Sequence, residues 1–573
     1  MLPANSHRFL ILLITLAGLA VRLWLSDWGG LSADEANGVA IAVTGSWADM
    51  VQHLREDGNP PLFYALLRVF NGLFGSSDAA LRLMSVIAST ALVPVAYLVA
   101  RKLAGDAVAV PVALVTALCP PIIRYGTMVR MYWLLPILSL VSTYLFIRLL
   151  AKPPGKGLRA GYVLSTALLI YCHHWGFIVA LGQTATAGLG LVRRWWSWRE
   201  LVPFVCCLAL AGLAYLPWLP SLHYTLTHDE SPWAQSPALT HLIIETPPEA
   251  LVGRLSFRHA WSELGIMYAA FWVAFSLVFA GRLPVGDPSP DQPGRHSPEE
   301  RQRSLNLLRW VVVFGLGGAL ALSSIKAAWR DRYLVAFSPA LIVLYCAVLS
   351  PFLRRLPRPA AALLPALIWL PAWIPQYLWL DAMPESSAWA ISDKIRRQCD
   401  RSRDLVVVSW EAAAPALSRT LPDAIPMIAF PDMERVAIVR WDGINARLRD
   451  DRRLFALFDR MKQVLDRRGT IWLVDSSHGT GVVAPPGSVS LAGMHYLAVE
   501  QLRMDQIRSW LKLNARQEDT FVWAPGRDIS LFLSRYRQAS PGEVAGAPGG
   551  LRQEQAMPEA VPAESGEFER GRP

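Results

Sequence analysis

The sequence predicts an α-helical, polytopic membrane protein that carries a small α/β domain after its last membrane span. Of the 573 residues, 53% are hydrophobic and 17% are charged, a balance too apolar for a soluble globular protein. Apolar runs close to the length that crosses a hydrocarbon core, about 20 residues, recur up to residue 380. After residue 381 they give way to short apolar segments between charged ones. We therefore expect a transmembrane domain over residues 1–380 and an α/β domain over 381–538.

About eleven transmembrane helices are expected, some of them from short runs. The apolar runs cover residues 8–26, 80–100, 107–123, 131–150, 160–173, 176–192, 201–219, 263–281, 309–325, 333–351 and 359–380. The first run has features of a signal peptide, because "MLPANSHR" is mildly basic and small residues follow. However, its apolar part is longer than a signal-peptide core and contains Arg22, which favours a retained first helix.

Basic residues indicate how the spans are oriented, because short loops rich in Lys and Arg stay on the cytoplasmic side. With a cytoplasmic N-terminus, the inner loops carry the basic clusters around Arg101, Arg159, Arg193, Arg301 and Arg354. The α/β domain then lies on the extracytoplasmic face of a multi-pass protein of the plasma (inner) membrane. The net charge of +10 therefore reflects orientation, and we expect no nucleic acid partner.

The region after residue 381 alternates charged helical stretches with strands. "DLVVVSW" (404–410) and "TIWLVDSS" (470–477) are typical of buried strands, and they follow "SDKIRRQC" and "DDRRLFALFDRMKQVLDRR". Residues 539–573 are rich in Gly, Pro, Ala and Glu without apolar periodicity, which predicts a disordered tail. "DSSHGTG" (475–481) places Ser, His and Asp close together, but there is no G-x-S-x-G elbow, so we expect an ordinary loop.

Arginines at two outer helix junctions oppose the orientation signal. Arg124 and Arg130 lie in "RYGTMVRMYW", and Lys326, Arg330 and Arg332 lie in "KAAWRDRYL". Cations so close to a bilayer need compensation. One interpretation is a site for a phosphate or pyrophosphate at the outer membrane surface, which guanidinium groups recognise well. The alternative is snorkelling to lipid phosphates or simple ion pairing, with carboxylates such as Asp34, Glu35, Asp57 and Asp331.

Two adjacent carboxylates, Asp34 and Glu35, follow the first apolar run in "LSADEANGVA". "SADE" is a plausible N-terminal cap of a helix. Beside the outer arginines, the pair also provides what sugar transfer from a lipid phosphate requires: a carboxylate for the acceptor hydroxyl and cations for the phosphate leaving group. One carboxylate can cap the helix while its neighbour takes part in catalysis, so both interpretations stand.

The order of the motifs resembles the GT-C glycosyltransferases of glycosyltransferase family 39, the relatives of protein O-mannosyltransferases and aminoarabinose transferases. The matching stretches are the acidic pair, "DGNPPLFYALLRVF" (57–70), "ALRLMSVIASTALVPVAYLVARKLAG" (80–105), "PPIIRYGTMVRMYWLL" (120–135), "YCHHWG" (171–176) and "RDRYLVAFSPAL" (330–341). The resemblance implies a GT-C fold, a polyprenyl-phosphate-linked sugar donor in the membrane lipid, and transfer to an acceptor on the extracytoplasmic face.

The resemblance also implies roles for individual residues. Asp34 and Glu35 would be the catalytic residues, with Asp34 as the general base and Glu35 helping to position the acceptor or a metal. The donor phosphate would be bound by Arg130 and Arg332, together with Arg124, Lys326 and Arg330. Residues expected to line the substrate cavity are Asp57, Asn59, Tyr64, Tyr132, His173, His174 and Tyr333.

The metal and the lining of the cavity stay open. Many relatives carry His before the paired prolines where this chain has Asn59, so a metal is not implied there. The adjacent histidines are more typical of a membrane interface than of a metal site. The sequence requires no cofactor and leaves a divalent metal open. The outer loop 220–262 is expected to cover the cavity, and its Trp and Tyr residues fit either sugar stacking or an interfacial aromatic belt.

Two other functions remain open from the sequence. A transporter or flippase would line its path with mid-membrane polar residues, whereas the charges here gather at one face. A non-catalytic binding protein for lipid-linked glycans would keep most of the same features. The donor sugar, the acceptor (protein, lipid or glycan), the stereochemical outcome, the oligomeric state and the role of the α/β domain are not determined by the sequence.

Overall fold

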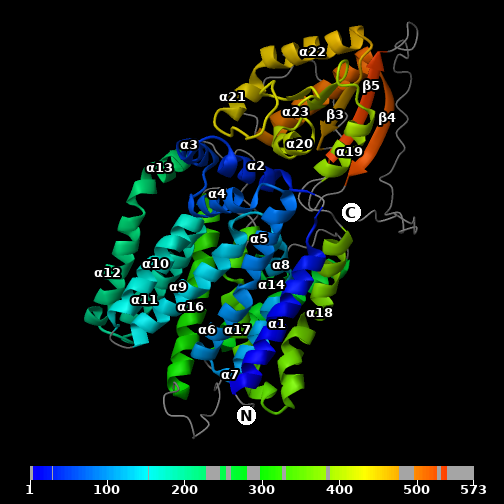
Figure 1. Ribbon diagram of the computed structural model, residues 1–573. Coiled ribbons are helices and arrows are strands. Elements are labelled where there is room, and N and C mark those ends of the chain that lie inside the picture. Colours follow the sequence, from blue (N-terminus) through cyan, green and yellow to red (C-terminus); the bar gives the residue numbers. More distant parts are fainter. Residues whose placement is uncertain are drawn as a thin grey trace.

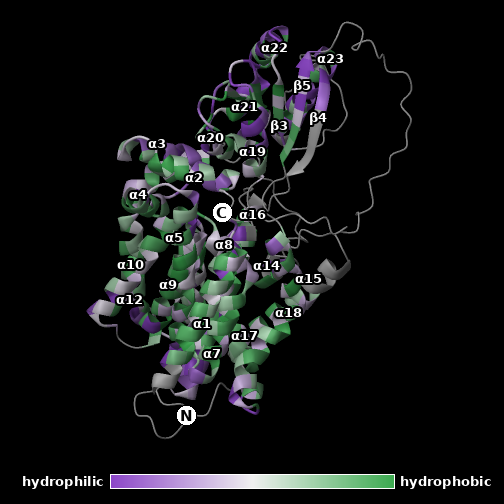
Figure 2. Ribbon diagram, turned by 45° about the vertical axis from the view of Figure 1, so that its right-hand side comes forward, coloured by the Kyte–Doolittle hydropathy of each residue, from purple (hydrophilic) through white to green (hydrophobic). Residues whose placement is uncertain are grey.

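The computed structural model shows a bundle of helices with an α/β domain seated at one end (Figure 1). It describes residues 4–28, 30–151, 154–227, 246–252, 260–280, 297–325, 331–382, 387–476, 496–524 and 531–538. Apolar residues run along the helices of the bundle, and hydrophilic residues gather at its far end and in the α/β domain (Figure 2). This distribution is that of a multi-pass membrane protein with a water-exposed domain.

Every predicted apolar run is helical. The helices are α1 (Ala4–Leu25), α5 (Asp78–Thr90) with α6 (Leu92–Leu103), α7 (Asp106–Leu118) with α8 (Pro120–Thr127), α9 (Leu134–Ala151), α10 (Lys156–Cys172), α11 (Trp175–Val192), α12 (Trp198–Ala214) with α13 (Leu219–Thr227), α15 (Ala260–Phe279), α16 (Pro298–Ile325), α17 (Ser338–Leu353) and α18 (Arg358–Ala382). Within the described residues, six helices are long and apolar enough to span a membrane, or up to eight if each bent pair is one span. The predicted number of eleven is therefore approximate.

The bend between α7 and α8 explains the buried Arg22. Pro120 and Pro121 provide no N–H, so carbonyl groups at the end of α7 lose their helical donors, and the two helices meet at 54°. The Nη1 of Arg22 in α1 donates to the carbonyl of Ala117 at 3.1 Å, and the Tyr377 hydroxyl of α18 donates to that of Leu118. A charged residue inside the first helix thus closes a gap in the backbone hydrogen bonding of its neighbour.

Short helices cover the end of the bundle below the α/β domain (Figure 1). They are α2 (Ala33–Val43), α3 (Trp47–Asp57) and α4 (Leu62–Phe74). The short helix α14 (Thr246–Val252) instead packs against α15, α8 and α17. Ser32 and Ser46 start α2 and α3 with capping boxes, in which the third helical residue is Glu35 or Asp49. Gly58 ends α3 at φ 73°, a left-handed conformation that glycine adopts without strain. Residues 53–75 are therefore helical on both sides of the Gly-Asn-Pro-Pro turn.

The C-terminal region forms one mixed five-stranded sheet with helices, in the order β2-β1-β3-β5-β4. Strands β1, β2 and β3 are parallel, whereas β5 is antiparallel to both β3 and β4. The predicted strands are β1 and β3, and α19 and α22 are the predicted charged helices. The elements are α19 (Ala388–Gln398), β1 (Leu405–Val408), η5 (Glu411–Ala413), α20 (Ala414–Thr420), β2 (Met427–Ala429), α21 (Ile444–Arg449), α22 (Asp451–Asp466), β3 (Ile471–Asp475), α23 (Tyr496–Asn514), β4 (Ala515–Ala524) and β5 (Leu531–Gln538).

The two faces of this sheet belong to different hydrophobic cores. Strand side chains alternate between faces, so Val406 and Val408 of β1 join the core that continues into the membrane helices. Leu405 and Val407 instead join a second core with α22 and α23. The α/β domain is therefore packed onto the membrane domain through buried apolar side chains.

Several expectations fall on residues that are not described. Most of "DSSHGTG", the tail 539–573, and residues 228–245 and 253–259 of the outer loop lie outside the described residues. All six cysteines are free.

Candidate active site

Helix α2 presents its two adjacent carboxylates in different directions. One helical residue turns by about 100° relative to the next, so Asp34 and Glu35 cannot share an environment. The Asp34 side chain is 28% exposed, whereas that of Glu35 is completely buried. The acidic pair therefore separates into one accessible and one internal carboxylate.

Glu35 is occupied by the protein itself. Its oxygens accept hydrogen bonds from both terminal nitrogens of Arg82 in α5, at 2.9 and 3.0 Å. They also accept from the backbone N–H groups of Ser32 and Val129, at 2.8 and 2.7 Å. All four donors belong to the protein, so the Glu35 carboxylate ties the start of α2 to α5 and to the backbone at Val129.

Asp34 lies between two guanidinium groups. Its Oδ1 is 3.3 Å from Nη2 of Arg130, and its Oδ2 is 3.0 Å from Nη1 of Arg332. Arg130 packs tightly against α2, because a Cβ at Gly38 would be only 2.7 Å from its Nη1. The ion pairing that the sequence left as an alternative to phosphate binding is therefore present, and it brings together residues from three distant parts of the chain.

A second carboxylate, Asp57, lies beside this group at the end of α3. Its oxygens accept hydrogen bonds from the side-chain amides of Asn59 at 2.6 Å and Asn37 at 3.2 Å. The pKa of Asp57 is raised to about 6, mainly by burial and to a smaller extent by the nearby Asp34 carboxylate. Arg130 and the two amides act in the opposite direction and lower this pKa. Asp57 is thus an acid that titrates close to neutral pH.

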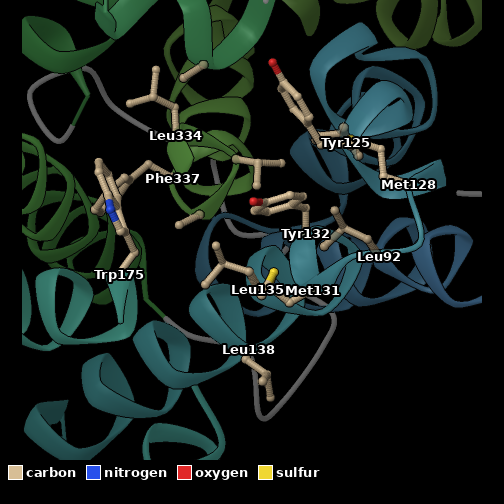
Figure 3. Packing of buried hydrophobic residues seen from close by; sticks show 14 of the residues in the cluster. Leu92, Tyr125, Met128, Met131, Tyr132, Leu135, Leu138, Trp175, Leu334 and Phe337 are labelled. Atoms are coloured by element: carbon tan, nitrogen blue, oxygen red, sulfur yellow. The ribbon is translucent and has the colours of Figure 1, made fainter. Parts of the chain in front are cut away.

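Aromatic residues surround the arginines. The guanidinium of Arg130 lies 5.8 Å from the ring centre of Tyr64, and that of Arg332 lies 5.4 Å from Tyr132. Tyr333 contacts His173, with ring centres 4.6 Å apart. Tyr132 and Trp175 also pack among buried apolar side chains that include Leu334 and Phe337 (Figure 3). These contacts place the charges next to a low-dielectric wall, where electrostatic interactions are stronger than in water.

Some predicted site residues lie elsewhere or have other contacts. The guanidinium of Arg124 lies against Trp379 of α18, 4.6 Å from its ring centre, while Lys326 and Arg330 are outside the described residues. The Nδ1 of His173 accepts the backbone N–H of Trp175 at 3.0 Å, whereas Nε2 of His174 is buried without a hydrogen-bond partner among the described residues. In the described part of the chain, no three His, Cys, Asp or Glu side chains form a metal site.

Two residues that complete the site were not identified from the sequence. Arg82 is 1% exposed, and a lone arginine in the apolar run "ALRLMSVI" could have been recognised as needing an acidic partner. Asn37 lies three residues after Asp34, about one helical turn, but nothing in its spacing distinguishes it from an ordinary helix residue. Arg82 and Asn37 donate hydrogen bonds to the carboxylates of Glu35 and Asp57, respectively.

Comparison with known proteins supports the predicted class. Residues 58–220 match the model of the dolichyl-phosphate-mannose-protein mannosyltransferase family, a stretch that includes Arg130, Tyr132 and both histidines but not α2. The comparison with curated proteins finds no match.

Solved structures share the fold over most of the chain. ArnT from Cupriavidus metallidurans bound to undecaprenyl phosphate is similar with a TM-score of 0.54 at 13% identity, over 95% of this chain and all of that one. The apo form of the same protein gives a TM-score of 0.55 at 14% identity, over 82% of this chain and 93% of that one. The oligosaccharyltransferase AglB from Archaeoglobus fulgidus was solved in complex with an inhibitory peptide and a dolichol-phosphate. It gives a TM-score of 0.52 at 10% identity, over 89% of this chain and 72% of that one. The resemblance to GT-C glycosyltransferases and the predicted fold class are thereby confirmed.

Proposed function

We propose that this protein is a membrane glycosyltransferase that transfers a sugar from a polyprenyl-phosphate-linked donor to an acceptor on the extracytoplasmic face. The observation that carries the proposal is the position of Asp34 between Arg130 and Arg332, 3.3 and 3.0 Å from their nitrogens. The matched family and the solved ArnT and AglB structures, bound to undecaprenyl phosphate and dolichol-phosphate, provide support.

The two arginines are suited to the leaving group. A guanidinium binds phosphate oxygens through paired N–H donors, and Arg130 and Arg332 come from different elements that converge on one point. Their side chains are 5% and 19% exposed, so their charge is only weakly screened by water. As the bond from the sugar C1 to the phosphate oxygen breaks, the lipid phosphate gains negative charge, which these cations stabilise.

Asp34 supplies the base on the acceptor side. The acceptor hydroxyl or amine attacks C1 of the sugar, its proton passes to the Asp34 carboxylate, and the lipid phosphate departs with the bonding electrons. A positioned base of this kind contributes about 10²- to 10⁴-fold in rate. Glu35 and Arg82 hold α2 in place, and no step of this scheme uses a metal.

Turnover of defined donors tests the proposal. Purified protein in lipid would be given radiolabelled polyprenyl-phosphate sugars, hexoses and pentoses in turn, with peptide, lipid and glycan acceptors. We expect acceptor-dependent loss of label from the lipid by the wild type with at least one donor, and at least a ~100-fold slower reaction for Asp34→Asn.

The matched control is Asp106→Asn. Asp106 also lies in the first turn of a helix and is paired with an arginine, Arg101, at 2.7 Å, but it belongs to a different helix pair, α6 and α7. It should keep wild-type activity. Donor binding without transfer to any acceptor would contradict the glycosyltransferase and favour a binding protein, and transbilayer movement of the donor without transfer would favour a flippase.

A further inference from the structure

The α/β domain is attached directly to the helix that carries Asp34. Its helix α20 packs against α2, and Val436, 4% exposed, belongs to the same buried core as Ala36 and Val39 of α2. At the edge of this contact, Arg419 of α20 pairs with Asp78 at the start of α5, at 2.5 Å. The domain is therefore fixed to the site end of the membrane bundle by both apolar and ionic contacts.

One side chain links the α/β domain to the acidic group of the site. Asn37 of α2 is 6% exposed, and its two amide atoms face opposite ways. Its Oδ1 accepts the backbone N–H of Val439 at 2.9 Å. Its Nδ2 donates to Oδ1 of Asp57 at 3.2 Å. The chain Val439–Asn37–Asp57 thus crosses from one domain to the other in two hydrogen bonds.

This link requires an amide. A carboxylate at position 37 could accept from Val439 but could not donate to Asp57, and it would place a second negative charge beside it. An apolar side chain could do neither. Asparagine carries an acceptor and a donor on one short side chain, so both neighbours are satisfied only when its orientation is fixed.

The segment that supplies Val439 is itself held in place. Arg435 donates to the carbonyls of Ser418, Pro422 and Ile425 at 3.1 to 3.2 Å. Further along, Asp442 accepts the hydroxyl of Tyr224 in α13 at 2.6 Å. Because both flanks of Val439 are anchored, its N–H is a fixed donor rather than part of a free loop.

We propose that Asn37 is a positioning residue through which the α/β domain holds Asp57 as the second carboxylate of the active site. The α/β domain is then part of the catalytic unit, because it fixes the amide that holds a carboxylate beside Asp34. This inference rests on the proposed transferase function for its kinetic readout. Asp57 is faced by Arg130, Asn59, Asp34, Asn37 and Tyr64.

Two variants of the full chain in lipid test the proposal. Asn37→Asp removes the donor and adds a charge, and Asn37→Leu removes both hydrogen bonds with little change in size. Since the amide favours the ionised form of Asp57, we expect the acid limb of the pH profile of kcat/KM to move to higher pH by about one unit. Asn514→Asp, the same substitution at an exposed position, should leave the profile unchanged.

Hydrogen exchange supplies a readout that does not depend on activity. Amides of residues 436–441 should exchange at least ~10-fold faster in Asn37→Leu than in the wild type, because the acceptor of the Val439 N–H is lost. Unchanged exchange in this variant overturns the link between domains. An unchanged acid limb in both variants overturns the effect on Asp57. If the wild type transfers no sugar, the proposed function fails, and the exchange experiment alone decides the inference.

Discussion

At the scale of single residues, the two carboxylates of "ADE" illustrate how neighbours in sequence take different tasks. Asp34 reaches Arg130 and Arg332, while Glu35 is buried against Arg82. The pairing of the first with outer arginines could be anticipated, because uncompensated cations at a membrane boundary need a partner. It could not be anticipated which of the two carboxylates faces inward, since this direction depends on where α5 places Arg82.

Arg332 is expected to govern donor binding. Arg332→Met should raise the Kd for a polyprenyl-phosphate sugar by about 10- to 100-fold, the value of one charge-assisted hydrogen bond to phosphate. Arg332→Lys should lose less, because it keeps the charge but not the planar fork. Equilibrium binding of labelled donor to protein in lipid measures both. The control is Arg397→Met, at a 75% exposed position in α19; equal affinity of all variants would contradict the assignment.

Asp57 is expected to set the acid limb of the pH profile. Its pKa of about 6 means that it is ionised above this pH and protonated below it. If the ionised form is needed to orient the acceptor, kcat/KM falls as the pH drops through about 6. Asp57→Asn, which cannot titrate, should lower the maximum and remove this limb. The informative range runs from about pH 5 to about pH 7, one unit on each side of this pKa. A wild-type kcat/KM that is constant over this range would show that Asp57 takes no part in the reaction.

At the scale of elements, local signals predict more than long-range ones. The cap of α2 and the strands β1 and β3 follow from capping residues and from the pattern of apolar residues. The role of Arg22 does not follow from such local signals. It depends on the break between α7 and α8 and on the close approach of α1, where a Cβ at Gly18 would be 3.1 Å from Ala117.

Glu35 of α2 and Arg82 of α5 form a buried ion pair, and removing one partner is expected to destabilise the fold strongly. Arg82→Met leaves the completely buried Glu35 carboxylate without its cation, a change that typically costs about 3 to 5 kcal/mol. The double variant Glu35→Gln with Arg82→Met should recover part of this loss. Reversible unfolding in detergent, compared between variants, measures the difference.

An exposed ion pair serves as the control for this prediction. Arg101 and Asp106 pair at 2.7 Å with side chains 46% and 25% exposed, so Arg101→Met should change stability by less than about 1 kcal/mol. Equal effects of Arg82→Met and Arg101→Met would mean that the Glu35 pair does not hold α2 in place.

At the scale of the whole molecule, the apolar runs and the change of composition near residue 381 predict the architecture, and the order of the motifs predicts its class. The contact between the α/β domain and α2 could not be predicted, because it joins Asn37 to Val439 across 402 positions of sequence. Such contacts are set by how two finished domains fit together rather than by any local pattern.

The orientation of the chain is a further expectation at this scale. An epitope placed after Gln538 should be accessible to antibody from outside in intact spheroplasts, because the basic loops retain the opposite face in the cytoplasm. An epitope placed within residues 284–296, between α15 and α16 in the sequence, should be detected only after permeabilisation. The reverse pattern would put the site on the cytoplasmic face and contradict the proposed use of an extracytoplasmic donor.

The most direct test of the central claim is a single-turnover measurement on Asp34→Asn with the labelled donor already bound. Removing the Asp34 charge frees Arg130 and Arg332, so we expect the donor to bind at least as tightly as in the wild type. The rate of sugar transfer should nevertheless fall by at least about 100-fold, the loss expected for a positioned base. A variant that binds donor and transfers sugar within about threefold of the wild-type rate would show that Asp34 is not the base.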